Sequence, residues 1–265
     1  GARQMIINID ATELLDAGDN LRITGWNPDL YHSALVTING AGEVVDLFYI
    51  CDHRSALVTG QRAVCSDREF PTIEIRNQWA IAAIGNALQR ELFRSSPHLF
   101  AIYGYNYGAV QASRSALAAA EIVGIIKSFA TKRSLPLRIY DSFDLRYFAA
   151  HKGNAKYGEI LDASRARWEP DGWLAFLDGI KAAKIIKADA RASLAVAQMA
   201  LTELRLKAGD LQLDDLDPAE RRAFVRETPS HPVHILRQPW GLFDDVEPPQ
   251  TLEQYLENEK ETAKN

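Results

Sequence analysis

Cysteine is scarce in this chain: only Cys51 and Cys65 occur among its 265 residues. Two cysteines make neither a disulfide framework nor a metal cluster. The sequence therefore excludes the class of small proteins held together by disulfides or by cysteine-bound metal. We expect both thiols to be reduced.

Long hydrophobic runs are lacking too. A membrane-spanning helix needs about 20 consecutive apolar residues, and no run in this sequence approaches that length. A positively charged leader followed by an apolar segment is also missing. We therefore predict a cytoplasmic protein of a bacterial or phage-infected cell, without membrane contact.

The chain has no overall excess of positive charge, since its net charge is −5 and its pI is about 5.7. This balance argues against a nucleic-acid partner for the chain as a whole. The charges are unevenly distributed, however: residues 110–191 contain 14 Lys and Arg against 9 Asp and Glu, and residues 209–265 contain 6 against 13. Because a local basic region is what attracts a polyanion, the middle of the chain is a candidate DNA-binding region. The alternative is that these charges are scattered over solvated surfaces.

The hydrophobic pattern predicts an α/β fold. In order, we expect strands at 21–30, 31–40 and 43–51, a helix at 74–94, a strand at 100–103, a helix at 110–131, a strand at 137–141 and a helix at 143–150. Residues 168–207 are also helical in pattern apart from Pro170 and Gly172, with a buried side over 188–206. An Asn-Gly turn joins the second and third strands into a hairpin. Helices that alternate with the later strands indicate parallel pairing there. The order is that of an RNase H-like mixed sheet of five strands, three antiparallel and then parallel ones, flanked by helices.

The domain organisation follows from shifts in composition. We expect one domain over residues 1–208, with an N-terminal extension at 5–20 and a long loop at 52–72. Residues 209–265 form an acidic extension, and five of the eleven prolines fall within 229–250. Its PWGLF segment is typical of an arm that docks onto another subunit or onto the core of its own chain.

Four stretches resemble the RuvC-like Holliday-junction resolvases, in a phage-like version. They are ITGWNPDLYHSALVTINGAG (23–42), AIYGYNYGA (101–109), LRYFAAHKGNAKYGEI (145–160) and ADARASLAVAQMA (188–200). They occur in the order of that family's motifs over about 180 residues. The resemblance implies the RNase H-like fold and a homodimer.

The resemblance also implies where a nuclease of this family would hold its metal ions. Such enzymes use two divalent ions, which require several carboxylates that converge at the ends of the central strands and on the last helix. The positions that correspond to those carboxylates are Asn27, Tyr103, Asp189 and Ala192, and the position of a lysine in the third motif is Tyr157. Only Asp189 is an acid, so the resemblance implies a degenerate catalytic site without a metal cofactor.

A rearranged acidic cluster is the alternative. Asp29 lies two residues beyond Asn27, on the same side of an extended chain, and with Asp189 it is a possible remnant of a metal site. Asp141 or Asp144 would complete such a site. The simpler interpretation is that Asp29 caps a strand end and that Asp141 and Asp144 begin a helix. If the alternative holds, Mg²⁺ is the expected cofactor.

Nucleic-acid binding rests on other residues. Phosphates are contacted by Lys, Arg, backbone N–H groups and helix N-termini, and the loop at 151–156 before a predicted helix offers all of these. The predicted DNA-binding residues are Arg114, Lys132, Arg133, Arg146, His151, Lys152, Asn154 and Lys156. Tyr105, Asn106 and Tyr107 are candidates for stacking on an unpaired base. Solvated surface, or packing in the case of the tyrosines, is the alternative for each.

Three functions remain open. The first is a pseudo-nuclease that binds branched or duplex DNA, or is a scaffold in a phage or bacterial nucleoprotein assembly. The second is an active Mg²⁺-dependent endonuclease. The third is a protein–protein interaction module that binds its partner through the C-terminal extension.

Overall fold

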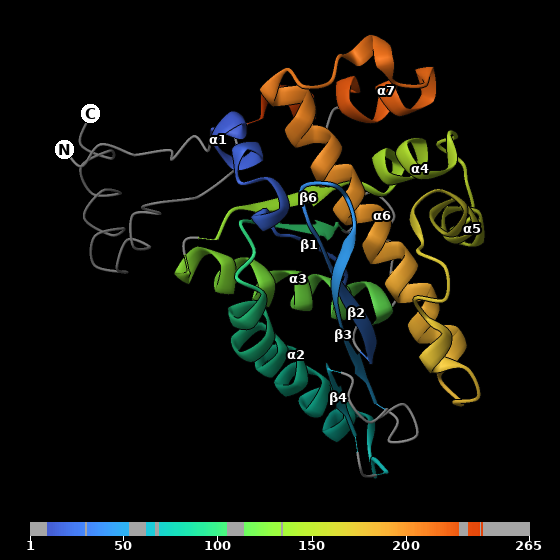
Figure 1. Cartoon of the computed structure of the whole chain (residues 1–265). Helices are drawn as coiled ribbons and strands as arrows, with labels where there is room; N and C mark the ends of the chain where they lie inside the picture. Colours follow the sequence, from blue (N-terminus) through green and yellow to red (C-terminus); the bar gives the residue numbers. More distant parts are fainter. Residues whose placement is uncertain are drawn as a thin grey trace, which may run out of the picture.

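The described residues form a six-stranded mixed sheet with helices on both faces (Figure 1). The computed structural model describes residues 10–29, 31–52, 62–66, 69–104, 114–133, 135–227, 233–238 and 240, and the side chains of 90–95 and 114–120 lie outside the described part. The strands are β1 (Ile23–Asn27), β2 (His32–Ile38), β3 (Val44–Cys51), β4 (Arg62–Cys65), β5 (Leu99–Tyr103) and β6 (Leu137–Tyr140). Their order in the sheet is β4-β3-β2-β1-β5-β6.

The strand pairing confirms the predicted mixed sheet. Strands β1, β2 and β3 are antiparallel neighbours, and β1–β5 and β5–β6 are parallel. The predicted strand count of five was wrong, because β4 pairs parallel to β3 inside the stretch that was expected to be a loop. This strand has only four residues, all partly exposed, so it lacks the alternation by which a strand is recognised. Cys65 of β4 lies beside Cys51 of β3, and the two are not joined by a disulfide.

The helices divide into two layers. The longer helices are α2 (Ile73–Ser95), α3 (Arg114–Lys132) and α6 (Ala183–Ala208), and the shorter ones are α1 (Ala11–Asp16), α4 (Ser142–Ala150), α5 (Tyr157–Trp168) and α7 (Pro218–Val225). Single 3-10 turns occur at Gly18–Asn20, Ala175–Leu177, Leu213–Asp215 and Ile235–Arg237. Helices α2 and α3 cover one face of the sheet, and α6 crosses the other (Figure 1).

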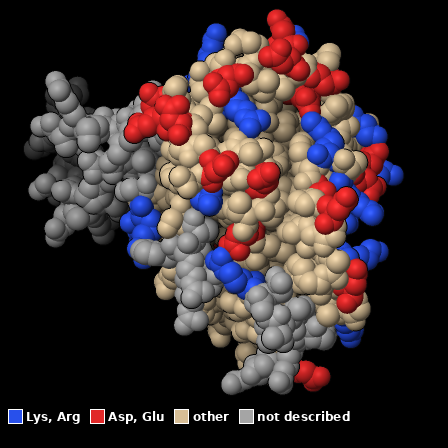
Figure 2. All heavy atoms as spheres, in the orientation of Figure 1, with Lys and Arg blue, Asp and Glu red and all other residues tan. Residues whose placement is uncertain are grey.

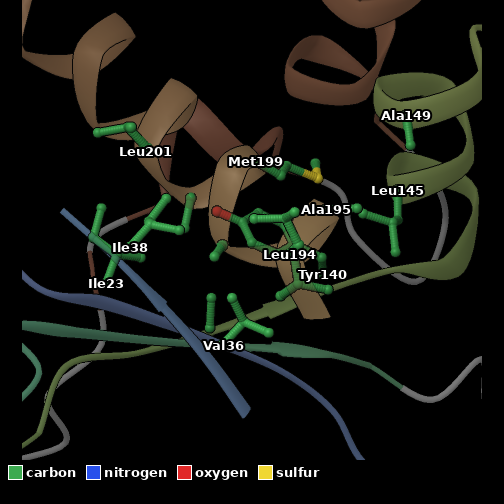
Figure 3. Close-up of a cluster of buried hydrophobic side chains, with 14 of the residues drawn as sticks. Ile23, Val36, Ile38, Tyr140, Leu145, Ala149, Leu194, Ala195, Met199 and Leu201 are labelled. Carbon is green, nitrogen blue, oxygen red and sulfur yellow. The ribbon is translucent and has the colours of Figure 1, made fainter. Parts of the chain in front are cut away.

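Alternating strand residues supply the two cores. In β1 and β2, Ile23, Val36 and Ile38 face α6, whereas Trp26 and Leu35 face α2 and α3. Figure 3 shows the first of these sets against Leu194, Ala195 and Leu201 of α6. Such period-two alternation is what a sheet covered on both faces requires. The amphipathic helix predicted at 74–94 and the buried side predicted over 188–206 are thereby confirmed. The helical pattern expected over 168–207 was too long, because α6 begins only at Ala183 and a 3-10 turn at Ala175–Leu177 precedes it.

Parts of both predicted extensions pack on the domain. Helix α1 begins after Asp10, whose carboxylate accepts a hydrogen bond from the N–H of Thr12. In the C-terminal stretch, Phe224 of α7 and Trp240 are buried in the same core as α6. Trp240 therefore docks onto its own chain, while Leu242 and Phe243 lie outside the described residues.

Candidate functional site at the end of the central strands

The positions predicted to form a site meet at one edge of the sheet. Asn27 ends β1 and Tyr103 ends β5, and these strands are parallel neighbours with Trp26 beside Ile102. The carboxyl ends of parallel strands share an edge, which is where α/β proteins place their ligands. The start of β2 reaches the same edge because only a short turn separates it from β1.

Gly25 brings helix α6 onto this edge. A Cβ atom at Gly25 would lie 2.2 Å from the backbone oxygen of Ser193, so only glycine permits the helix to approach so closely. The hydroxyl of Ser193 accepts a hydrogen bond from the N–H of Asn27 (2.9 Å) and donates one to the carbonyl of Ala34 (2.6 Å). Asp189 lies one turn before Ser193, and this contact therefore places it at the strand ends.

Asn27 and Tyr157 are directly bonded. The side-chain amide of Asn27 donates a hydrogen bond to the Tyr157 hydroxyl over 3.0 Å, and Tyr157 is the first residue of α5. Burial raises the pKa of the Tyr157 phenol above its ordinary value, with further contributions from the charges of Asp189, Tyr103 and Asp29. The hydrogen bond therefore brings two of the positions singled out by the motifs together.

Asp189 is buried and paired with a histidine. Its carboxylate oxygen Oδ2 lies 2.8 Å from Nδ1 of His32, the first residue of β2. Burial raises the pKa of Asp189 to about 6, although the hydrogen bond and charge of His32 oppose that rise. For His32, burial disfavours the protonated form, but Asp189, Asp29 and Asp52 outweigh it and raise its pKa.

Asp29 lies on the other side of the same imidazole. Its Oδ1 atom is 3.7 Å from Nε2 of His32 and accepts a hydrogen bond from the N–H of Tyr31 (3.2 Å). The latter bond is that of an Asx turn, so the capping role considered for Asp29 is present. Asp29 and Asp189 are therefore both at the site, with His32 between them.

Asp141 and Asp144 have other partners. Asp141 caps α4 by accepting a hydrogen bond from the N–H of Phe143 (2.7 Å), and Arg226 donates to Asp144 (2.8 Å) and lies 3.4 Å from Asp141. In the described part of the chain, no three His, Cys, Asp or Glu side chains group as a metal site. A pair of Mg²⁺ ions does not fit these residues, because an amide donor and one carboxylate held by histidine do not neutralise two divalent ions.

Tyr103 and Ala192 complete the set of corresponding positions. Ala192 is buried on α6 and brings no polar atom. Tyr103 is partly buried, and its burial raises the pKa of the phenol, with Arg146 and Ser142 of α4 as hydrogen-bonding neighbours. Both residues fill space at this edge without adding an anion at neutral pH.

The basic loop at 151–156 lies between α4 and α5, next to Tyr157. Lys152 is ion-paired with Glu159, and the exposed Lys156 precedes the first turn of α5, with its N–H bonded to Glu159 (2.7 Å). His151 faces Glu220 (3.4 Å) and Asp217 (3.7 Å). Asn154 is exposed. Lys152 and Lys156 are thus the cations that the loop presents.

The other predicted DNA-binding residues are spread more widely. Lys132 and Arg133 lie at the end of α3, which returns from the carboxyl end of β5 to the start of β6. They lie at the opposite edge of the sheet from the loop, so they do not extend its surface, and their role in DNA binding stays a prediction. Arg146 is on α4 beside Tyr103. The side chain of Arg114 and residues Tyr105, Asn106 and Tyr107 lie outside the described part.

The face drawn in Figure 2 carries interspersed acidic and basic side chains. Several of the cations in residues 110–191 have acidic partners, as in the Arg191–Glu169 pair (2.5 Å) and the Lys187–Asp178 pair (2.5 Å). The positive excess of this region therefore does not translate into an equally large free positive surface.

Sequence reasoning missed His32. Its position carried a usable signal, since the first residue of a strand that follows β1 through a short turn must lie at the edge where β1 ends. A histidine at that place lies two residues before Ala34, the strand partner of Asn27, and contacts α6 through Asp189. Polarity alone does not mark it, because the run YHSALVTING is typical of an ordinary strand.

No protein-family model and no curated protein matches the chain. Similar solved structures include Thermus thermophilus RuvC in complex with a Holliday junction substrate, with a TM-score of 0.44 and 15% identity over 72% of this chain and 96% of that chain. The yeast mitochondrial Holliday junction resolvase Ydc2 has a TM-score of 0.45 and 11% identity over 76% of this chain and 88% of its own. At these values the likeness concerns the general course of the chain and carries nothing about activity. In the described part, no helix is both long and apolar enough to cross a membrane.

Proposed function

We propose that this chain binds DNA, branched or duplex, without cutting it, as a RuvC-like protein whose two-metal site has been lost. The observation that carries the proposal is the bonding of Asn27 and Asp189. Asn27 donates its amide hydrogen to Tyr157, and the buried Asp189 is held by His32. The polar groups at the catalytic edge are therefore engaged with one another.

The chemistry of phosphodiester cleavage explains why this arrangement favours DNA binding without cleavage. Two-metal nucleases stabilise the attacking and the leaving oxygen with ions about 3.5–4 Å apart. Each Mg²⁺ needs anionic oxygen ligands at about 2.1 Å in near-octahedral geometry. An amide, a phenol and a methyl group at Asn27, Tyr103 and Ala192 supply none of these anions at neutral pH.

Helix α5 supports the binding half of the proposal. It has 12 residues and begins at Tyr157, so its positive end lies beside the site. Lys152 and Lys156 flank that end, and the ion pair of Lys152 with Glu159 is exposed. Exposed pairs contribute only about 0–1 kcal/mol, so a DNA phosphate readily replaces Glu159 as the partner of Lys152.

A salt-titrated binding experiment tests the proposal. A labelled four-way junction and a duplex of equal length are titrated with the chain between about 50 and 200 mM salt, because phosphate binding weakens steeply over that range. Replacing both Lys152 and Lys156 by Ala is expected to weaken binding and to flatten the salt dependence by about two ion equivalents. Lys132→Ala, at the opposite edge of the sheet, is the matched control and should change neither quantity.

The same samples decide between the three functions. Incubation of the junction with Mg²⁺ or Mn²⁺ is expected to leave both strands intact, and cleavage that depends on Asp189 would instead establish the nuclease. Absence of salt-sensitive binding would favour the interaction module. Light scattering with and without DNA tests the expected homodimer, and removal of residues 241–265 tests a protein partner bound through the C-terminal extension.

A further inference from the structure

The imidazole of His32 lies between two carboxylates and uses its two nitrogens differently. Nδ1 is within hydrogen-bond distance of Asp189, at 2.8 Å. Nε2 is 3.7 Å from Oδ1 of Asp29, which is longer than a hydrogen bond between nitrogen and oxygen. Nε2 and the Asp29 carboxylate therefore face each other across a gap that a direct hydrogen bond does not close.

That gap has the size of a shared metal ion. Zinc and similar ions lie about 2.0–2.2 Å from imidazole nitrogen and from carboxylate oxygen, so two ligand atoms of one ion are roughly 3–4 Å apart. The side chains of His32 and Asp29 are 33% and 47% exposed. An ion between them would be reached from solvent and would keep open coordination positions.

Asp189 supplies the support that a metal-binding histidine normally has. A ligating imidazole usually donates its second N–H to a carboxylate, which fixes the ring and makes the other nitrogen a better ligand. Asp189 holds Nδ1 in this way, and its side chain is only 5% exposed. With the proton assigned to Nδ1, Nε2 of the neutral ring is the nitrogen with a free lone pair, and it lies 3.7 Å from Oδ1 of Asp29.

A second histidine shows that nearby carboxylates alone are not enough. His151 also has carboxylates within 4 Å of both nitrogens, from Glu220 and Asp217. There, however, Arg167 is ion-paired with Glu220 and its guanidinium lies 3.3 Å from Nε2 of His151. A permanent cation already occupies the position that a metal ion would need.

We infer that Nε2 of His32 and Oδ1 of Asp29 form a site for one divalent transition-metal ion, with Asp189 as the residue that positions His32. The ligand set of nitrogen and oxygen suits Zn²⁺ or Co²⁺. The open positions accept water or one oxygen of a phosphate group. This inference goes beyond the proposed function and does not rest on it, since one ion at His32 and Asp29 differs from a Mg²⁺ pair held by carboxylates.

Cobalt titration of the untagged full-length chain tests the site without DNA. Co²⁺ bound to a histidine and a carboxylate gives visible absorption bands, and Zn²⁺ should displace it with a stoichiometry of one. Asp29→Asn is expected to lower the affinity for Co²⁺ at least about 10-fold, and Asp189→Asn by about 10- to 100-fold. His151→Gln is the matched control and should leave the titration unchanged.

Asp29→Asn is chosen because this variant should keep the native fold. The side chain is about half exposed, and an asparagine oxygen still accepts the hydrogen bond from the N–H of Tyr31, so the turn is kept. Circular dichroism checks that the variants are folded. The inference is overturned if the native chain gives no visible bands with Co²⁺, or if Asp29→Asn binds as tightly as the native chain.

Discussion

Helix α6 carries two buried carboxylates, Asp189 and Glu203, whose surroundings differ. They are fourteen residues apart, about 21 Å along the helix. Glu203 is fully buried and bonded to Arg138 (2.6 Å), Tyr140 (2.8 Å) and Lys207 (2.9 Å). Asp189 has one hydrogen-bonded partner, the titratable His32, at a partly open edge. Arg138 and Lys207 thus balance the charge of Glu203, whereas the partner of Asp189 is a histidine whose own charge changes with pH.

Glu203 with Arg138, Tyr140 and Lys207, here called the Glu203 cluster, contacts the C-terminal end of the described chain. The guanidinium of Arg138 and the ammonium of Lys207 lie 4.7 and 4.9 Å from the ring of Trp240, which is buried. Lys207 also donates to the backbone oxygen of Gln238 (2.5 Å). Cations over an aromatic ring, anchored by one carboxylate, lock this stretch onto the domain. Among the described residues, no comparable set of permanent cations surrounds Asp189, whose hydrogen-bonding partner is His32.

Removal of the Glu203 charge should produce the largest loss of stability. Glu203→Gln leaves Arg138 and Lys207 buried without a carboxylate, and loss of one partner of a buried pair costs about 3–5 kcal/mol. Urea denaturation measures the free energy of unfolding. Glu13→Gln, an exposed acid on α1, is the control and should cost less than about 0.5 kcal/mol. A similarly small cost for Glu203→Gln would remove the basis of the comparison.

Asp189→Asn should instead change how stability depends on pH. The raised pKa of Asp189, about 6 against an ordinary 3.8, means that the folded chain retains a proton that the unfolded chain has released. Stability from this group therefore falls as pH rises from about 4 to 6. His32, whose pKa is also raised, stabilises the fold below its ordinary pKa of 6.5, and this contribution is lost as pH rises through its folded pKa.

Both groups thus weaken the native chain as pH rises, and the shift of Asp189 alone corresponds to about 3 kcal/mol. The measurement is the difference in unfolding free energy between the native chain and Asp189→Asn from pH 4 to 8. The native chain should lose stability relative to the variant across that range. Asp16→Asn, at an exposed site on α1, should show a flat difference. A flat difference for Asp189→Asn as well would mean that the pair is not coupled to folding.

Tyr140→Phe tests how tightly the Glu203 cluster is closed. The Tyr140 hydroxyl donates to Oε2 of Glu203 over 2.8 Å in a fully buried setting. A hydrogen bond to a charged group contributes about 1.5–3 kcal/mol, so we expect a loss of about 2 kcal/mol in urea denaturation. Tyr140→Phe in the Glu203→Gln background should cost less, because the charged acceptor is gone. Equal costs in both backgrounds would show that the hydroxyl acts independently of the carboxylate.

Much of the fold could be predicted because it follows from the spacing of apolar residues within single strands and helices. Alternating apolar residues in β1 and β2 and the apolar stripes of α2 and α6 follow from the geometry of strands and helices. Strand β4 could not be predicted, since four partly exposed residues carry no periodic signal. The Glu203 cluster also escaped prediction, because glutamate is almost never fully buried unless paired, and its partner Arg138 lies 65 residues away in sequence.

The candidate site was predictable only in part, for a similar reason. Asn27, Tyr103 and Asp189 follow from the motifs, and parallel strands bring the first two to one edge. His32 is joined to Asp189 across 157 residues, so the pair appears only when α6 is laid on the sheet. Lys132 was predicted to bind DNA together with the residues of the basic loop, but α3 ends at the opposite edge of the sheet. The chain's topology, not its composition, decides both cases.

Tyr157→Phe should have the smallest effect and completes the comparison. The Tyr157 hydroxyl accepts a hydrogen bond from Asn27, whereas the Tyr140 hydroxyl donates one to Glu203. Tyr157 is 42% exposed, and its bond joins two neutral groups. Water can replace the lost acceptor, so we expect a cost of about 0.5–1 kcal/mol in urea denaturation. The Tyr140→Phe variant is the matched control, since each change removes one hydroxyl from one ring. If Tyr157→Phe cost as much as Tyr140→Phe, the edge around Asp189 would be closed as firmly as the Glu203 cluster, and an opening for a ligand there would lose its physical basis.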